Sequence, residues 1–230
     1  MRTIGLLGGM SWESSVAYER LLTDEVRRRL GPSHSASMLV RSYDFAEIEA
    51  LQAAGDWEGA GRLLAADARA LQDAGAGLVI LCTNTMHRVA DAIEAAIDVP
   101  FLHIADATAA AVRAAGVRRV GLLGTRYTME GAFYRGRLEK RHGLDVIVPP
   151  PADRAVVHAV IYDELVRGVI RDASRDACRA IVGRLVDEGA EGIIAGCTEI
   201  ELLLRPEDVP APYFPTTRIH ALAAVDAALA

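Results

Sequence analysis

Two stretches of the chain decide the fold: LQDAGAGLVILCTNT at residues 71–85 and LVDEGAEGIIAGCTEI at residues 185–200. Each stretch runs from the end of a helical segment through a glycine turn into a short apolar run with a polar tip. Glycine commonly ends a helix, and a short apolar run after it is typical of a buried parallel strand. The two stretches therefore predict two strands at equivalent places in a repeated structure.

The repeat extends outward from these two strands. The tetrapeptide GLLG at 5–8 recurs at 121–124, and each copy closes a predicted strand. The predicted strands are 3–7, 37–42, 78–82, 119–123, 144–148 and 192–196. The predicted helices are 12–30, 57–74, 86–96, 104–115, 129–141, 156–169, 175–188 and 217–230. Strands that alternate with helices indicate parallel sheets with crossover connections.

The predicted fold class is α/β, with two pseudo-symmetric parallel-sheet domains and the active site in the cleft between them. The first domain is expected at 1–100 plus 210–230, where the last helix crosses back, and the second at 101–209. Prolines at 100, 149–151 and 206–215 separate these parts. Ligands of such folds gather at the carboxyl ends of the strands.

Superposing the two halves on their glycine turns gives a register for the polar tips. Cys82 then falls on Gly196, and Thr83 falls on Cys197. Neighbouring residues of a strand point to opposite faces of the sheet, so a shift of one residue in the superposition moves a side chain to the other face. The register predicts that Thr83, and not Cys82, is the counterpart of Cys197.

Composition excludes several classes of protein. The net charge of −6 argues against nucleic acid as the main partner, and no apolar run approaches the ~20 residues that span a membrane. Three cysteines in a chain of 230 residues favour a reduced, cytoplasmic protein. Of these, Cys82 and Cys178 are expected to be core residues, because cysteine is among the most buried residue types.

No cofactor is expected. A pyridoxal phosphate enzyme needs a buried lysine for its Schiff base, whereas the only lysine, Lys140, stands in a charged helical stretch. No His/Cys spacing indicates a metal site. The GLLGG segment lacks the third glycine and the acidic partner of a dinucleotide fingerprint.

Five segments carry a resemblance to a known family: GLLGGMSWESS (5–15), CTNTMH (82–87), HIADAT (103–108), GLLGTRYTM (121–129) and AGCTEI (195–200). They resemble the aspartate/glutamate racemases, and most closely the bacterial branch of broad-specificity amino-acid racemases. The resemblance covers nearly the whole chain. It implies cofactor-independent racemisation by two bases on opposite faces of the α-carbon, and a homodimer.

In most of that family both bases are cysteines, so Thr83 departs from the pattern while Cys197 keeps it. A thiol pKa can be lowered towards neutrality, which suits Cys197 as the base; a threonine hydroxyl is a far weaker acid and suits Thr83 as the proton donor. The resemblance implies that the residues contacting the amino-acid substrate include Met10, Gln52 and Thr83–Thr85. Glu164, on a predicted helix of the second half, could accept hydrogen bonds from the ammonium group of the substrate.

The side chains and amides of Asn84, Thr85, Thr198 and Glu199 could hold the α-carboxylate, because they stand where strands end and helices begin. Asn84 and Thr198 could equally be helix caps, and His87 is expected to pack or cap rather than catalyse. Three arginines are candidates for a distal carboxylate: Arg41, Arg126 and Arg167.

Three alternatives stay open. The first is another activity of the same superfamily, such as a decarboxylase, a maleate isomerase or a hydantoin racemase. The second is a catalytically silent amino-acid-binding or regulatory protein. The third concerns the substrate, because broad or neutral specificity, including homoserine-like amino acids, is compatible with the sequence.

Overall fold

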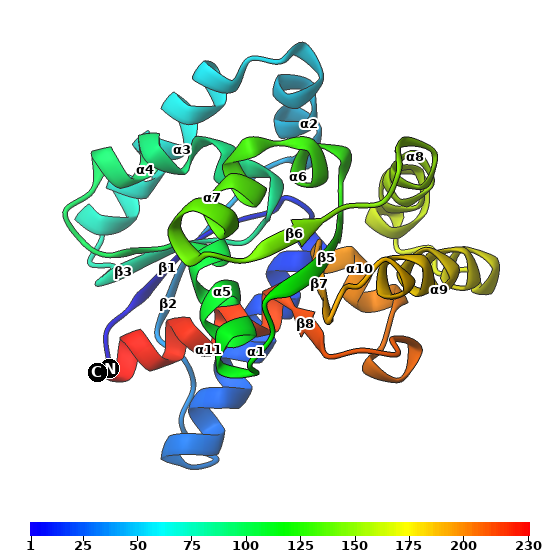
Figure 1. Cartoon of the computed structure of the whole chain (residues 1–230). Coiled ribbons are helices and arrows are strands. Elements are labelled where there is room, and N and C mark those ends of the chain that lie inside the picture. The colour runs from blue at the N-terminus through cyan, green and yellow to red at the C-terminus, as the bar shows by residue number, and fades with distance from the viewer. The chain divides into compact units, whose positions relative to one another are not determined.

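The computed structural model describes all residues from 1 to 230. The chain forms two compact units, Met1–Ile104 with His220–Ala230 and Ala105–Ile219. It leaves the first unit at the start of α5 (Ile104–Ala114) and returns to it within α11 (Thr216–Leu229) (Figure 1). None of its helices combines the length and the apolar character needed to cross a membrane.

The first unit is a four-stranded parallel sheet with the order β2-β1-β3-β4. Its strands are β1 (Ile4–Gly8), β2 (Met38–Ser42), β3 (Leu78–Leu81) and β4 (Phe101–Leu102). Its helices are α1 (Trp12–Leu30), α2 (Phe45–Ala54), α3 (Trp57–Asp73), the 3₁₀ helix η1 (Thr85–Val89) and α4 (Ala90–Ala96).

Helices cover both faces of this sheet. Alternate residues of its central strands point to opposite sides, and the residues on both sides are apolar, so each face needs a layer that buries it. Leu7, Val79 and Leu81 face a core built with α2, α3 and α4. Leu6, Ile80 and Cys82 face a second core, built with α1 and α11. The main chain just before β1 also joins α11, through a hydrogen bond from the Arg2 amide to the Ala228 carbonyl at 2.8 Å.

The second unit is a parallel sheet with the order β6-β5-β7-β8. Its strands are β5 (Arg119–Gly124), β6 (Asp145–Ile147), β7 (Gly192–Gly196) and β8 (Tyr213–Pro215). Its remaining helices are α6 (Arg126–Glu130), α7 (Ala132–His142), α8 (Pro151–Ala159), the π-helix η2 (Val160–Glu164), the 3₁₀ helix η3 (Leu165–Arg167), α9 (Asp172–Asp187), α10 (Thr198–Leu203) and the 3₁₀ helix η4 (Pro206–Asp208).

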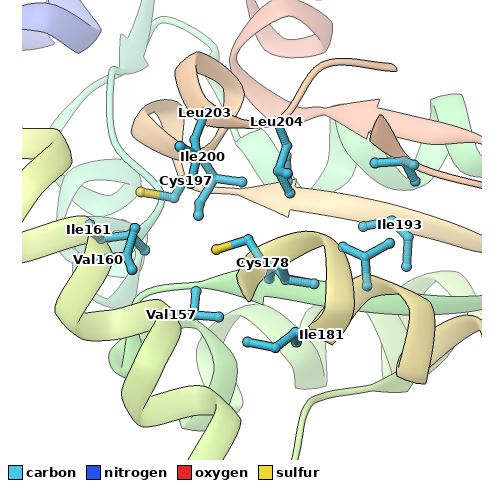
Figure 2. Close-up of a cluster of buried hydrophobic side chains, with 14 of the residues drawn as sticks. Val157, Val160, Ile161, Cys178, Ile181, Ile193, Cys197, Ile200, Leu203 and Leu204 are labelled. Atoms are coloured by element: carbon cyan, nitrogen blue, oxygen red, sulfur yellow. The ribbon is translucent and has the colours of Figure 1, made fainter. Parts of the chain in front are cut away.

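A buried apolar cluster lies between β7 and the helices α8, α9 and α10 (Figure 2). Ile193 and Ala195 of β7 contribute to it, together with Cys178 of α9 and Cys197 at the strand tip. Alternation along the strand places Ile193, Ala195 and Cys197 on one face of the sheet. The fold thus buries Cys197 to 5% exposure at the edge of a dry core.

The glycines of the repeat allow the central strands to approach closely at their carboxyl ends. A Cβ on Gly124 would lie 2.7 Å from the carbonyl oxygen of Gly196, the residue before Cys197. Gly9 has φ +82°, a left-handed conformation that favours glycine, directly after β1. Larger residues would therefore displace the turns that follow the strands.

The predicted alternation of strands and helices is confirmed, but several elements differ. Residues 210–219 belong to the second unit, because β8 pairs with β7 there, whereas the sequence placed them in the first domain. The helix predicted at 156–169 is divided into α8, η2 and η3. The elements α2, α10, β4 and β8 were not among those predicted.

Candidate active site

The two central strand pairs have the same register. Val79 lies opposite Gly5, as Ile193 lies opposite Gly121. Ile80 lies opposite Leu6, and Ile194 lies opposite Leu122. The superposition made on the sequence is therefore confirmed for the strands, and it places Thr83 and Cys197 at equivalent positions after them.

The tip in the first unit consists of the residues that follow β1 and β3. These strands are parallel neighbours, so Met10 and the segment Thr83–Thr85 leave the same edge of the sheet. Gln52 reaches this segment from α2, where its amide nitrogen lies 3.1 Å from the sulfur of Met86. All of these side chains are 8% exposed or less. Met10 and Gln52 are thus both buried near the segment that follows β3.

The tip in the second unit pairs a thiol with a carboxylate. The Cys197 Sγ donates a hydrogen bond to Oε2 of Glu199 at 2.9 Å, and both side chains are buried. Cys197 occupies the position that caps α10, and Thr198 is the first residue of that helix. Neither Asn84 nor Thr198 caps a helix with its side chain, so capping does not explain these residues.

The environment of Cys197 corrects the expectation of a lowered thiol pKa. Burial raises the pKa of Cys197 well above its usual value, and the negative charge and hydrogen bond of Glu199 raise it further. Hydrogen bonds from the backbone N–H groups of Glu199 and Ile200 act in the opposite direction. The thiol is therefore protonated in this structure, and its hydrogen bond is directed at the Glu199 carboxylate.

Glu164 is held by α9 and its preceding loop. Its carboxylate accepts a hydrogen bond from Ser174 at 2.6 Å and pairs with Arg171 at 3.4 Å. It stands at the end of the π-helix η2, and its negative charge acts on Cys178. The structure gives Glu164 partners within the second unit rather than a contact with Cys197 or Glu199.

The three candidate arginines have different surroundings. Arg41 pairs with Asp67 at 3.1 Å and stacks on the ring of Tyr43, with 4.4 Å from the guanidinium carbon to the ring centroid. Arg167 is exposed in η3. Arg126 begins α6 directly after β5, the strand that pairs with β7, and it is exposed with no ion pair. Of the three, Arg126 leaves the sheet at the edge where Cys197 lies.

The other two cysteines lie in apolar surroundings, as the sequence predicted. Cys82 is fully buried in the core beneath α1 and α11, and burial raises its pKa. Cys178 is also fully buried, within the apolar cluster of the second unit, and burial raises its pKa to about 11. A cysteine held as a neutral core residue is not prepared for acid–base chemistry.

Replacement of Cys82 by alanine should therefore leave most of the racemisation activity that the family resemblance implies. The expected cost is a loss of unfolding free energy on the order of 1 kcal/mol, because a small buried side chain leaves a small cavity. Chemical denaturation and chiral chromatography measure the two effects separately. A folded but inactive Cys82→Ala protein would show that Cys82, rather than Thr83, is the acid–base residue of the first unit.

Two functional contacts escaped the sequence reasoning. The bond between Cys197 and Glu199 spans only two residues, so the short spacing in GCTE was a usable signal. His87 bonds to the Thr83 carbonyl and to the Ile104 amide, and the second of these contacts joins distant parts of the sequence. Lys140 is exposed on α7, as predicted.

No group of three His, Cys, Asp or Glu side chains is arranged to hold a metal ion.

Fold and site together define a class of protein: a duplicated α/β chain with a hydroxyl or thiol side chain, Thr83 or Cys197, at the same place in each copy. A model of the Asp/Glu/hydantoin racemases matches residues 7–224. The chain belongs to the Asp/Glu/hydantoin racemase family, and this membership implies an isomerase.

Solved structures of similar proteins agree with this assignment. A candidate Asp/Glu racemase from Yersinia pestis is 53% identical, with full coverage of both chains and a TM-score of 0.94. An aspartate racemase homologue from Pyrococcus horikoshii is 32% identical, again with full coverage of both chains, and has a TM-score of 0.87. A glutamate racemase from Francisella tularensis shares the fold at 16% identity, with 99% of this chain and 81% of that chain covered and a TM-score of 0.65.

Proposed function

We propose that this protein interconverts the enantiomers of an amino acid without a cofactor, with Cys197 and Thr83 exchanging the α-proton on opposite faces of the substrate. The observation that carries the proposal is the contact between the Cys197 thiol and the Glu199 carboxylate, at the strand position equivalent to that of Thr83. Membership of a racemase family supports the reaction type.

The Cys197–Glu199 pair provides the base. As the sulfur takes the α-proton, the thiol proton passes to Glu199, so that no free thiolate accumulates in the dry core. A buried thiolate beside a carboxylate would be costly, which is why the pKa of Cys197 is raised. The pair therefore removes a proton only as fast as Glu199 can accept one.

Thr83 provides the acid. Its hydroxyl gives a proton to the opposite face of the carbanion and is reprotonated from water, while Glu199 returns its proton to water. These two transfers restore the resting enzyme and balance the protons of a turnover. Negative charge that grows on the substrate carboxylate can be stabilised by Asn84, Thr85, Thr198 and the adjacent main chain.

Independence of pyridoxal phosphate is supported by the position of the only lysine. Lys140 is exposed in the last turn of α7. A Schiff-base lysine is normally buried with the cofactor. The chemistry of this chain is accordingly assigned to its own acid and base groups.

We further propose an acidic amino acid as substrate, since similar proteins are described as aspartate or Asp/Glu racemases. Arg126 is the candidate for the distal carboxylate, because it has no acidic partner and follows β5. Met10 and Gln52 are proposed to contact the substrate from the first unit.

Incubation of the protein with single enantiomers in heavy water tests the function. The expected result is loss of the α-hydrogen signal in proton NMR together with appearance of the opposite enantiomer. Aspartate, glutamate and neutral amino acids, including homoserine, are compared in the same assay. Tight binding of an amino acid with neither exchange nor inversion would identify a binding protein instead.

Replacement of Glu199 by glutamine should lower racemisation about 10²–10⁴-fold, because the thiol proton loses its acceptor. The same change removes a negative charge beside the sulfur, so the pKa of Cys197 should fall and thiolate should form at lower pH. The difference in ultraviolet thiolate absorbance between this protein and its Cys197→Ala derivative, followed against pH, measures the shift.

Glu201→Gln is the matched control. Glu201 is also largely buried, with a pKa raised by burial to about 8, but it accepts a hydrogen bond from the Thr217 amide at 2.7 Å rather than from the thiol. This variant should keep its activity and the titration of Cys197. A Glu199→Gln protein with normal activity would show that Glu199 is not the proton acceptor.

A further inference from the structure

His87 holds the main chain of Thr83 in place. It lies in η1 with 2% exposure, and its Nδ1 is 2.7 Å from the carbonyl oxygen of Thr83. Its Nε2 is 3.2 Å from the backbone nitrogen of Ile104, the first residue of α5. The His87 ring thus bonds to the main chain of the proposed catalytic residue, Thr83, and to the main chain of Ile104, which lies 17 residues after His87.

These two contacts fix the protonation state of the ring. The backbone N–H of Ile104 can only donate, so Nε2 of His87 is the acceptor and carries no proton. The proton of the neutral ring is therefore on Nδ1 and is donated to the Thr83 carbonyl. Since both nitrogens are occupied by main-chain groups, His87 has no site left to exchange a proton with a substrate.

The Thr83 carbonyl needs this partner because the sheet ends before it. The last amide of this strand bonded to β1 is that of Cys82, which donates to the Leu7 carbonyl at 2.9 Å. β3 itself ends at Leu81. A buried carbonyl beyond the strand must find another donor, and the His87 imidazole supplies it.

Neighbouring rings keep His87 from turning. The ring of His103 lies 4.5 Å away between centroids, that of Phe101 5.7 Å and that of His220 5.9 Å. His220 donates to the Leu102 carbonyl at 2.8 Å and accepts from the Tyr18 hydroxyl at 2.8 Å. Burial lowers the pKa of His220 to about 4, so this neighbour is uncharged at neutral pH.

We propose that His87 is a positioning residue for Thr83, which fixes the direction of its hydroxyl by anchoring its carbonyl. The inference rests on the proposed function, because it gives Thr83 the role of proton donor. Displacement of a reacting group by about 1 Å can cost about 10²-fold in rate. The role of His87 is thus specific to the step that Thr83 performs, and proton removal by Cys197 does not depend on it.

Two variants separate the two bonds of the ring. Asparagine can place an amide N–H near the position of Nδ1, and glutamine can place a carbonyl oxygen near that of Nε2. His87→Asn should keep the bond to Thr83 and lose the bond to Ile104, whereas His87→Gln should do the reverse. Both remove the same buried ring, so their melting temperatures should fall by similar amounts.

The measurements are inversion by chiral chromatography and α-hydrogen exchange with retained configuration, both in heavy water, with aspartate, glutamate and neutral amino acids. His87→Gln should lose about 10²-fold in inversion but keep the exchange that Cys197 catalyses, while His87→Asn should keep inversion within about tenfold. Equal inversion rates in the two variants, or parallel loss of inversion and exchange, would overturn the inference alone. A wild-type protein with neither exchange nor inversion would overturn the proposed function and, with it, the role given to His87.

Discussion

Replacement of Cys197 by alanine should abolish both racemisation and α-hydrogen exchange. The loss should reach about 10⁴-fold, the upper end of the range for a general acid–base group, because the thiol that is proposed to take the α-proton is gone. The substitution also leaves Glu199 without its bond from the thiol. Chiral chromatography and proton NMR in heavy water, at equal concentrations of folded protein, give the two rates.

Cys178→Ala is the matched control for this variant. Cys178 belongs to the same apolar cluster as Cys197, but it lies on α9 and has no bond to Glu199 (Figure 2). It should lose stability without losing the reaction, so the comparison separates chemistry from packing. Appreciable racemisation by a folded Cys197→Ala protein would remove the thiol from the mechanism.

Replacement of Thr83 by alanine should have a different signature. Inversion should fall about 10²–10³-fold, since the acid on one face is gone, while exchange by the Cys197–Glu199 pair should continue with retained configuration. Only one enantiomer should exchange its α-hydrogen, because only one enantiomer directs this hydrogen at the Cys197 sulfur. We expect this enantiomer to be the L form. The NMR signal of that enantiomer should disappear in heavy water without formation of its mirror image.

Thr83→Ser and Thr83→Cys test whether another side chain that can donate a proton replaces threonine at this position. Serine keeps a hydroxyl and should retain inversion, whereas cysteine would restore the thiol pair implied by the family resemblance. An unchanged rate of inversion in Thr83→Ala would show that a different group, or water alone, protonates the second face.

The strand repeat could be predicted because it depends on local chemistry. Gly5 and Gly121 begin the same tetrapeptide, and the structure pairs them with Val79 and Ile193 as the superposition required. Side chains alternate between the two faces of a strand, so one matched pair of residues fixes the register of the whole strand. Assigning Thr83, rather than Cys82, as the counterpart of Cys197 in the repeat followed from this register alone.

Other features depend on tertiary contacts that no local pattern encodes. The raised pKa of Cys197 follows from burial and from the orientation of Glu199, which a residue list does not contain. Residues 160–164 form a π turn, which places more residues in a turn than an α-helix and so changes the face on which Glu164 lies. The Glu164 carboxylate accepts a hydrogen bond from Ser174.

Short elements were also missed for physical reasons. β8 has three residues and ends in Pro215, so its place in the sheet comes from pairing with β7 rather than from strand propensity. α10 has six residues and no side-chain cap. Its first residue can be predicted only after the end of β7 has been predicted. Length and capping are the signals that sequence reasoning uses, and both elements lack them.

The equal register of the two strand pairs has a consequence for the history of the chain. Shared glycines, a shared strand order and a shared register of the central strands are what duplication and fusion of one ancestral gene leave behind. Thr83 and Cys197 then descend from a single codon that was copied and later diverged. The hydroxyl and the thiol are two versions of one inherited position, and the chemical asymmetry of the enzyme is younger than its fold.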